Sequence, residues 1–207
     1  MQGPFFDCLG TMNLTLPKTV EINGECYDIR YDFRVILEII AMLNDPDLEN
    51  EDKAEALLTM FYVNPEQLTD TRKAVDQCFR FIDCNSTRKA KRGPKLVDWE
   101  QDFDYIVAPV NRVLGYESRS VEYDQEANTG GVHWWTFLSA YMEIGNDSLF
   151  SQIVSIREKQ AYHKKLEKGE REWARRNADL VALQQRFSES ENALFDEWTK
   201  GVKQNGG

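Results

Sequence analysis

The side chains with the most chemical potential gather in one stretch, GGVHWWTF, at residues 130–137. It holds His133, one of only two histidines in the chain, followed directly by Trp134 and Trp135. A histidine against large aromatic rings could belong to a metal or catalytic pocket, to a platform on which bases stack, or to the start of a buried helix. These three interpretations need different neighbours.

The neighbours of His133 favour a structural role. It is the best single catalytic candidate, but the adjacent sequence offers no carboxylate that could orient its ring. Glu143 lies ten residues further on, almost three helical turns away. A histidine at the start of a helix more often caps or packs than catalyses. We therefore expect His133 to be part of the core.

The tryptophan pair also fits a buried helix better than a stacking platform. Base-stacking aromatics work beside a positive groove, and this segment has none. Within residues 134–144 only Thr136, Ser139 and Glu143 are not apolar, which is typical of a helix buried among other helices. We expect Gly145 to end this helix and Asp147 to cap the next. The predicted core signature is His133, Trp134, Trp135, Phe137 and Trp99.

Other catalytic and cofactor chemistry is not indicated. The four cysteines, Cys8, Cys26, Cys78 and Cys84, form no C-x-x-C pair, and two histidines could hardly complete a zinc site. The chain contains no phosphate-binding loop, dinucleotide fingerprint, nucleophile elbow or H-E-x-x-H motif. Glu100, Asp102 and Asp104 suit the first turns of a helix and lack a matching base or nucleophile. We expect no enzyme, no cofactor and no metal.

A short basic segment, NSTRKAKRGPK at residues 85–95, is the one candidate for contact with nucleic acid. It lacks large apolar residues and interleaved aromatics, and reads as an exposed linker. The whole chain carries a net charge of -10 and a pI near 4.8, which disfavours general binding to phosphate backbones. We expect a linker, and keep nucleic-acid contact as the alternative. That alternative would use Arg88, Lys89, Lys91, Arg92 and Lys95.

The elements that must position these residues are mainly α-helical. The segment TVEINGECYDI alternates around Asn23-Gly24 and predicts a β-hairpin, with either Tyr27 and Ile29 or Cys26 facing the core. Hydrophobic residues make up 42% of the chain, enough for a packed helical core, and no apolar run approaches a membrane span. The predicted organisation is an extension or alternative start at 1–11, hairpin and helices at 12–84, a basic linker at 85–97, a helical half built on the HWWTF helix at 98–180, and a helical appendage with a disordered tail at 181–207.

Several helices can be outlined from the spacing of their apolar residues. Asp32 is positioned to cap the first. Val75, Cys78, Phe79 and Ile82 predict the inner face of a third helix before the linker. After the linker, a helix led by Trp99 contains Pro109, where a kink or break is expected.

The C-terminal part predicts a long helix with a narrow apolar seam. Apolar residues recur there every seven positions amid charge, as on a helix that packs on a partner or folds back along the bundle. We expect the first two to be core, and the later ones to be candidates for partner binding. The seam consists of Leu166, Trp173, Leu180, Phe187 and Leu194.

Taken together, WEQDFDYIVAPVNRVLG, HWWTF, IVSIREKQ and KLEKGEREWARRN resemble the bacteriophage gene-product-fifteen family, from about Met12 to Asn177. These proteins belong to tailed phages and prophages and are encoded beside the tape-measure gene. The resemblance implies a mainly helical tail assembly chaperone that binds the tape-measure or tail-tube protein in the host cytoplasm and is absent from the mature virion. It supplies no catalytic residue, and it leaves self-association open. A nucleic-acid-contacting protein, or a small enzyme built around His133, are the alternatives.

Overall fold

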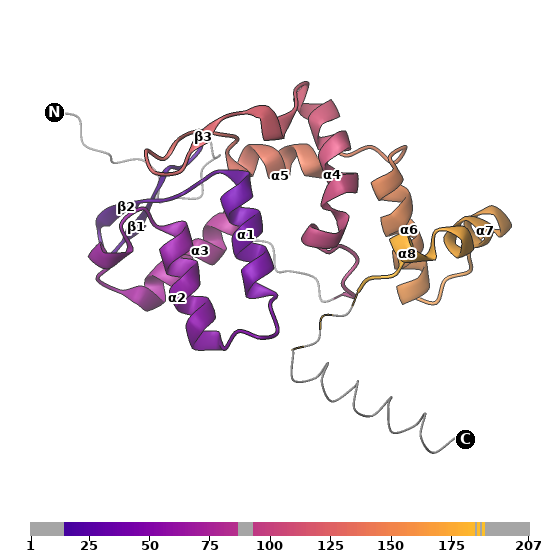
Figure 1. Cartoon of the computed structure of the whole chain (residues 1–207), viewed down its shortest axis with the longest axis horizontal. Coiled ribbons are helices and arrows are strands. Elements are labelled where there is room, and N and C mark those ends of the chain that lie inside the picture. The colour runs from indigo at the N-terminus through magenta and orange to yellow at the C-terminus, as the bar shows by residue number, and fades with distance from the viewer. Residues whose placement is uncertain (1–14, 87–92, 185, 187, 189–207) are drawn as a thin grey trace, which may run out of the picture.

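A computed structural model describes residues 15–86, 93–184, 186 and 188. The fold is mainly α-helical, with a small N-terminal hairpin, as predicted (Figure 1). The elements are β1 (Thr19–Ile22), β2 (Glu25–Asp28), α1 (Phe33–Leu43), α2 (Asn50–Phe61), α3 (Thr71–Ile82), α4 (Trp99–Leu114), β3 (Tyr123–Asp124), β4 (Thr129–Gly130), α5 (Trp134–Met142), α6 (Leu149–Ala161), α7 (Lys168–Arg176) and α8 (Ala178–Val181), with 3-10 turns at Pro65–Gln67 and Ser118–Ser120.

The predicted N-terminal hairpin is confirmed. β1 and β2 pair antiparallel, with Ile22 opposite Glu25. Asn23 and Gly24 form the turn with φ of 56° and 87°, the positive values that a two-residue hairpin turn requires. Tyr27 is buried and Cys26 is exposed, so the strand places the first of the two predicted sets against the core.

α1, α2 and α3 form the N-terminal helical layer. As predicted, Asp32 is the N-cap of α1, and its carboxylate accepts the backbone N–H of Arg34. The predicted inner face of α3 is partly wrong, because Phe79 is 44% exposed whereas Phe81 is 2% exposed. The Phe81 ring packs edge-on against Phe61 at 5.3 Å. Contact with another aromatic therefore determines which face of α3 is buried.

The second half differs from expectation at its helix ends. α4 continues through Pro109 without a break. α5 ends at Met142 with Glu143 as its C-cap, so Gly145 does not cap it, and Ser148 rather than Asp147 caps α6. The Ser148 hydroxyl accepts the backbone N–H of Ser151 at 3.0 Å, which leaves the Asp147 carboxylate free to pair with a side chain of α4.

The described part of the predicted long C-terminal helix is instead two short helices, α7 and α8. His163, with φ of 53°, separates α6 from α7. Asn177, with φ of -122° and ψ of 42°, separates α7 from α8. These non-helical backbone angles interrupt the seven-residue spacing, so its positions cannot share one straight face.

The seam residues in the described region pack within the chain. Leu166 and Trp173 lie half-buried against a small cluster of Ile156, Ala174 and Val181, and Leu180 is also half-buried. Other predictions fall on positions outside the described residues. These are the extension at 1–11, the linker's Arg88, Lys89, Lys91 and Arg92, and seam residues Phe187 and Leu194.

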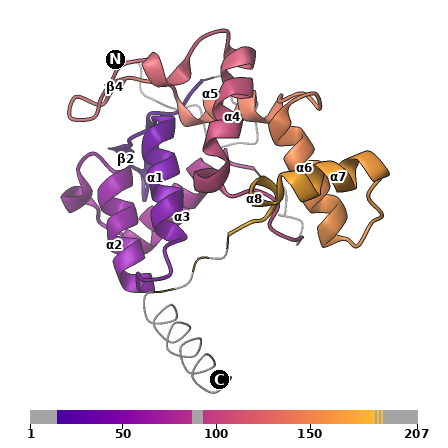
Figure 2. The same cartoon turned by 45° about the vertical axis from the view of Figure 1, so that its right-hand side comes forward.

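One large core joins the segments on either side of the linker. It contains buried side chains from the hairpin and α1–α3, and also from α4, α5 and the start of α6. α4 packs across α5 and α6, and α7 projects from this end of the molecule (Figures 1 and 2). Within the described residues, no helix is both long and apolar enough to span a membrane.

Candidate functional site

His133 is the N-cap of α5, and both of its ring nitrogens are engaged. Nδ1 accepts the backbone N–H of Trp135 at 3.1 Å, so the ring proton lies on Nε2 and is donated to the carbonyl of Pro17 at 2.8 Å. The ring stacks on Tyr31, with centroids 5.4 Å apart. Burial lowers the pKa of His133 below its usual 6.5. The histidine is therefore neutral at physiological pH, and both of its nitrogens are bonded to groups of the chain itself.

A buried carboxylate lies next to His133, but it bonds to other groups. The chain around Asp32 pairs antiparallel with the chain around His133. The Asp32 carboxylate accepts the backbone N–H of Val132 at 2.7 Å and the Arg34 guanidinium at 2.7 Å. Residues a hundred positions apart carry this contact, so sequence spacing could not reveal it. Asp32 and His133 are thus adjacent helix caps with paired backbones, and the carboxylate is not bonded to the histidine ring.

Gly131 is what allows Asp32 to approach so closely. Its φ is +71°, and a Cβ there would lie 2.2 Å from Oδ2 of Asp32. Gly130, with φ of +78°, would place a Cβ 2.4 Å from the backbone oxygen of Glu122. The two glycines therefore do more than end a loop, because they make room for the junction between α1 and α5.

The two indoles that follow His133 connect α5 to the end of α3. Trp134 donates from Nε1 to the carbonyl of Ile82 at 2.9 Å, and Trp135 donates to that of Phe81 at 2.8 Å. Carbonyls in the last turn of a helix lack helical partners, so these bonds satisfy them. Trp134 is 1% exposed and Trp135 is 7% exposed. Neither ring is available for stacking on a base.

The remaining signature residues complete this packing. Phe137 stacks on Phe33 with centroids 4.4 Å apart. Trp99, at the start of α4, is half-buried and lies 4.7 Å from the ring of Tyr141 and 5.8 Å from that of Trp134. The structure thus brings all five signature residues to one junction between the two halves of the fold.

A second buried polar centre, which sequence reasoning missed, joins Asp102 of α4 to Arg157 of α6. The guanidinium contacts both carboxylate oxygens, at 2.7 and 3.0 Å. It also donates to the carbonyls of Leu96, Leu180 and Val181, so all five N–H donors of the arginine are used. Both side chains are almost fully buried. This ion pair fixes α8 and the end of the linker against α4.

The end of the basic linker also contacts the start of α4. Lys95 pairs with the buried Asp98 at 2.8 Å, and Asp98 in turn caps α4 by accepting the backbone N–H groups of Glu100 and Gln101. Lys95 is thus committed to a carboxylate of its own chain. Lys95 is the member of the predicted nucleic-acid segment that lies within the described residues 93–184, and its partner there is Asp98.

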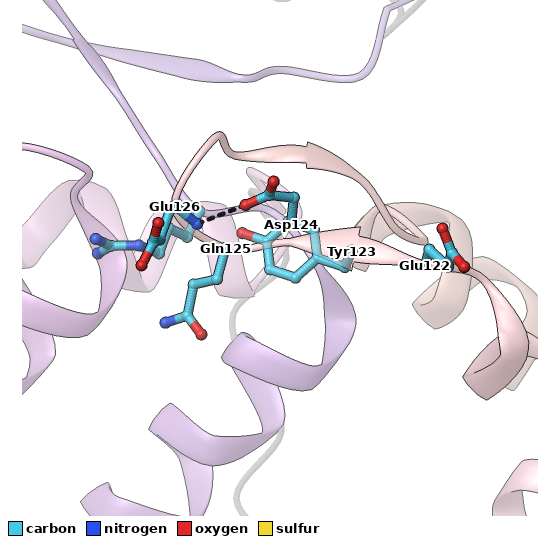
Figure 3. Close-up of a pocket in the computed structure, with 6 residues that line it drawn as sticks. Glu122, Tyr123, Asp124, Gln125 and Glu126 are labelled. Atoms are coloured by element: carbon cyan, nitrogen blue, oxygen red, sulfur yellow. Dashed lines mark hydrogen bonds between the residues drawn. The ribbon is translucent and has the colours of Figure 1, made fainter.

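A shallow hollow on the surface lies between Arg30 and residues 122–126 of the β3–β4 turn. Figure 3 shows the Asp124 carboxylate turned back onto the backbone N–H of Glu126, a bond of 3.0 Å. Arg30 donates to carbonyls at the end of α2, including that of Thr59. These polar groups stabilise turns and helix ends. Among the described residues, no cluster of His, Cys, Asp or Glu could hold a metal ion.

The fold and the junction between its two halves define a mainly helical protein. The five residues of the core signature stabilise this architecture. Residues 12–183 match the family described as Bacteriophage Gp15 protein. The chain therefore belongs to this phage family, as the motifs indicated. No curated protein and no solved structure matches it.

Proposed function

We propose that this phage protein is a tail assembly chaperone that binds the tape-measure protein, the tail-tube protein, or both, without catalysis. In this proposal it acts in the host cytoplasm and does not stay in the mature virion. The observation that carries the proposal is the family match over residues 12–183. A chaperone of this kind needs a stable helical body and a surface for a helical client.

The hydrogen bonds and the burial of the reactive side chains support a binding role. Both nitrogens of His133 and all five donors of Arg157 are committed to groups of the chain itself. The Cys78 thiol is fully buried, and burial raises its pKa, so it stays protonated and unreactive. Each of these groups stabilises or fills the fold.

The surface that best fits a helical client is an apolar edge where α4 ends and α6 begins. Val113, Tyr116 and Leu149 are 43%, 44% and 44% exposed, and we call them the α4–α6 edge. Arg112 is adjacent to Val113 in sequence, and Asp147 lies two residues before Leu149. The two side chains form an ion pair at 3.1 Å that holds the two helix ends together. Exposed apolar side chains on a fixed framework can pack against the apolar stripe of an amphipathic helix.

The test is co-expression with the tape-measure protein of the same phage. We expect the tape-measure protein to stay soluble and to co-purify with the chain. The double variant Val113→Asp/Leu149→Asp should lose this interaction while keeping its circular dichroism melt, because both side chains are exposed.

Phe79→Ser is the matched control, since Phe79 is as exposed as Leu149 but lies on α3. It should retain the client. An insoluble tape-measure protein that does not co-purify with the wild-type chain would contradict the proposed function. Loss of binding in the control alone would move the client surface to α3.

A further inference from the structure

Charge is distributed very unevenly along this acidic chain. Residues 45–55 contain six acidic residues and one lysine, whereas residues 157–176 contain eight lysines and arginines and four glutamates. The first segment forms the α1–α2 loop and the start of α2, and the second forms the end of α6 and all of α7. In both views α7 lies at the right of the molecule, away from α1 and α2 (Figures 1 and 2).

The positive charge on α7 is largely unneutralised. Lys159 and Lys164 each pair with a glutamate of the same region. Five other cations are exposed, and no carboxylate of the described residues lies within ion-pair distance of them. Among the described residues, Arg171 and Arg176 donate to backbone carbonyls and have no carboxylate partner. We call this set the basic end: Lys165, Lys168, Arg171, Arg175 and Arg176.

The region around the start of α2 presents exposed carboxylates. They occupy the loop before α2 and its first two turns, and the backbone of this region is fixed by the helix and by packing of α2 on α1. We call this set the acidic end: Asp47, Glu49, Glu51, Asp52 and Glu55. One chain thus carries two exposed sets of charged side chains of opposite sign, on separate elements of the fold.

We propose that the basic end of one copy binds the acidic end of a second copy, head to tail. A bound pair still offers one unoccupied end of each sign, so the contact can repeat and build a ring or an open chain of copies. The net charge of -10 does not prevent it. At physiological salt, charges more than about 8 Å apart are largely screened, so the facing side chains decide the interaction.

This inference does not depend on the proposed chaperone function, because it concerns only copies of this chain. The full chain is studied by sedimentation velocity over a range of concentrations. We expect the weight-average mass to rise with concentration at about 0.1 M salt and to return to the monomer value at about 0.5 M, where screening is stronger. A chain that is monomeric at every concentration and salt would overturn the proposal.

Charge reversal at each end identifies the surfaces. Arg171→Glu/Arg175→Glu replaces two of the five cations of the basic end by carboxylates, and we expect self-association to weaken by at least about tenfold, because attractive pairs are lost and repulsive ones are introduced. The control variant Arg72→Glu/Arg80→Glu changes the net charge equally but on exposed positions of α3. It should self-associate as the wild type does, and a weakening equal to that of the α7 variant would refute the assignment.

A mixing experiment separates a specific contact from a general charge effect and from misfolding. Glu51→Lys/Asp52→Lys replaces two of the five carboxylates of the acidic end by cations, and this variant alone should also self-associate more weakly than the wild type. Mixed with the α7 variant, its wild-type basic end meets that variant's wild-type acidic end, so association should reappear. Absence of rescue would count against the head-to-tail contact. So would tight binding of a labelled DNA duplex by the basic end of a chain that stays monomeric, since the partner would then be a polyanion.

Discussion

Gly131→Ala tests the central claim about the junction, namely that a missing side chain admits the Asp32 carboxylate. The substitution adds one methyl group to a residue with φ of +71°. It places that methyl 2.2 Å from Oδ2 of Asp32 and 3.0 Å from Cδ2 of Tyr123, so the carboxylate has to move.

Two costs add in this variant. A left-handed backbone costs an alanine about 1–2 kcal/mol. Displacement of the carboxylate weakens its hydrogen bonds to the backbone N–H of Val132 and to Nη2 of Arg34, and bonds to charged groups contribute about 1.5–3 kcal/mol each. With partial relaxation, the expected loss in the free energy of unfolding is about 3–5 kcal/mol.

The assay is urea denaturation followed by tryptophan fluorescence and circular dichroism. Gly115→Ala is the matched control, because Gly115 has φ of +79° but a Cβ added there would meet nothing within 4 Å. It should lose only the backbone cost of about 1–2 kcal/mol. If both variants lose the same amount, within about 0.5 kcal/mol, then close approach of Asp32 contributes nothing and the account of the junction is wrong.

Three further outcomes are expected. Asp102→Ala leaves the buried Arg157 without its counter-charge and should cost about 3–5 kcal/mol in urea denaturation; a cost below about 1 kcal/mol would contradict burial of the pair. Trp135→Ala removes a 7% exposed ring and its bond to the carbonyl of Phe81, so its thermal melt should show a loss of about 3–5 kcal/mol. Because burial lowers the pKa of His133, the unfolded chain binds a proton that the folded chain does not, and stability should fall as pH decreases through about 6.5. His133→Gln should flatten that slope, and an unchanged slope would assign it to other groups.

Sequence patterns predicted correctly those elements that are determined by residues close together in the chain. Asn23-Gly24 specified the hairpin, because few residues accept two successive positive φ angles. Asp32 predicted the start of α1, because a carboxylate at that position can accept a free backbone N–H. The run of apolar residues after His133 predicted a buried helix. In each case, neighbouring residues carry all the information needed.

The errors arose where distant residues decide the outcome. Phe79 and Phe81 are both plausible members of the inner face of α3, and only the rings of other elements select Phe81. Asp147 and Ser148 are both good caps; in the structure Ser148 caps α6, and Asp147 pairs with Arg112 of α4. Pairing of a residue with one far along the chain leaves no periodic signal, which is why the Asp102–Arg157 ion pair and the hydrogen bond from Val132 to Asp32 were missed.

The junction also limits where a partner can bind. Asp32 and His133 cap α1 and α5, and their backbones pair with each other, so opening one cap exposes the other. A client that required access to HWWTF would therefore have to break both caps and the tryptophan bonds to α3. Variants in this motif should lose client binding only together with stability. Variants at the α4–α6 edge should lose binding at an unchanged melting temperature, and that difference separates a residue that contacts the client from one that maintains the fold.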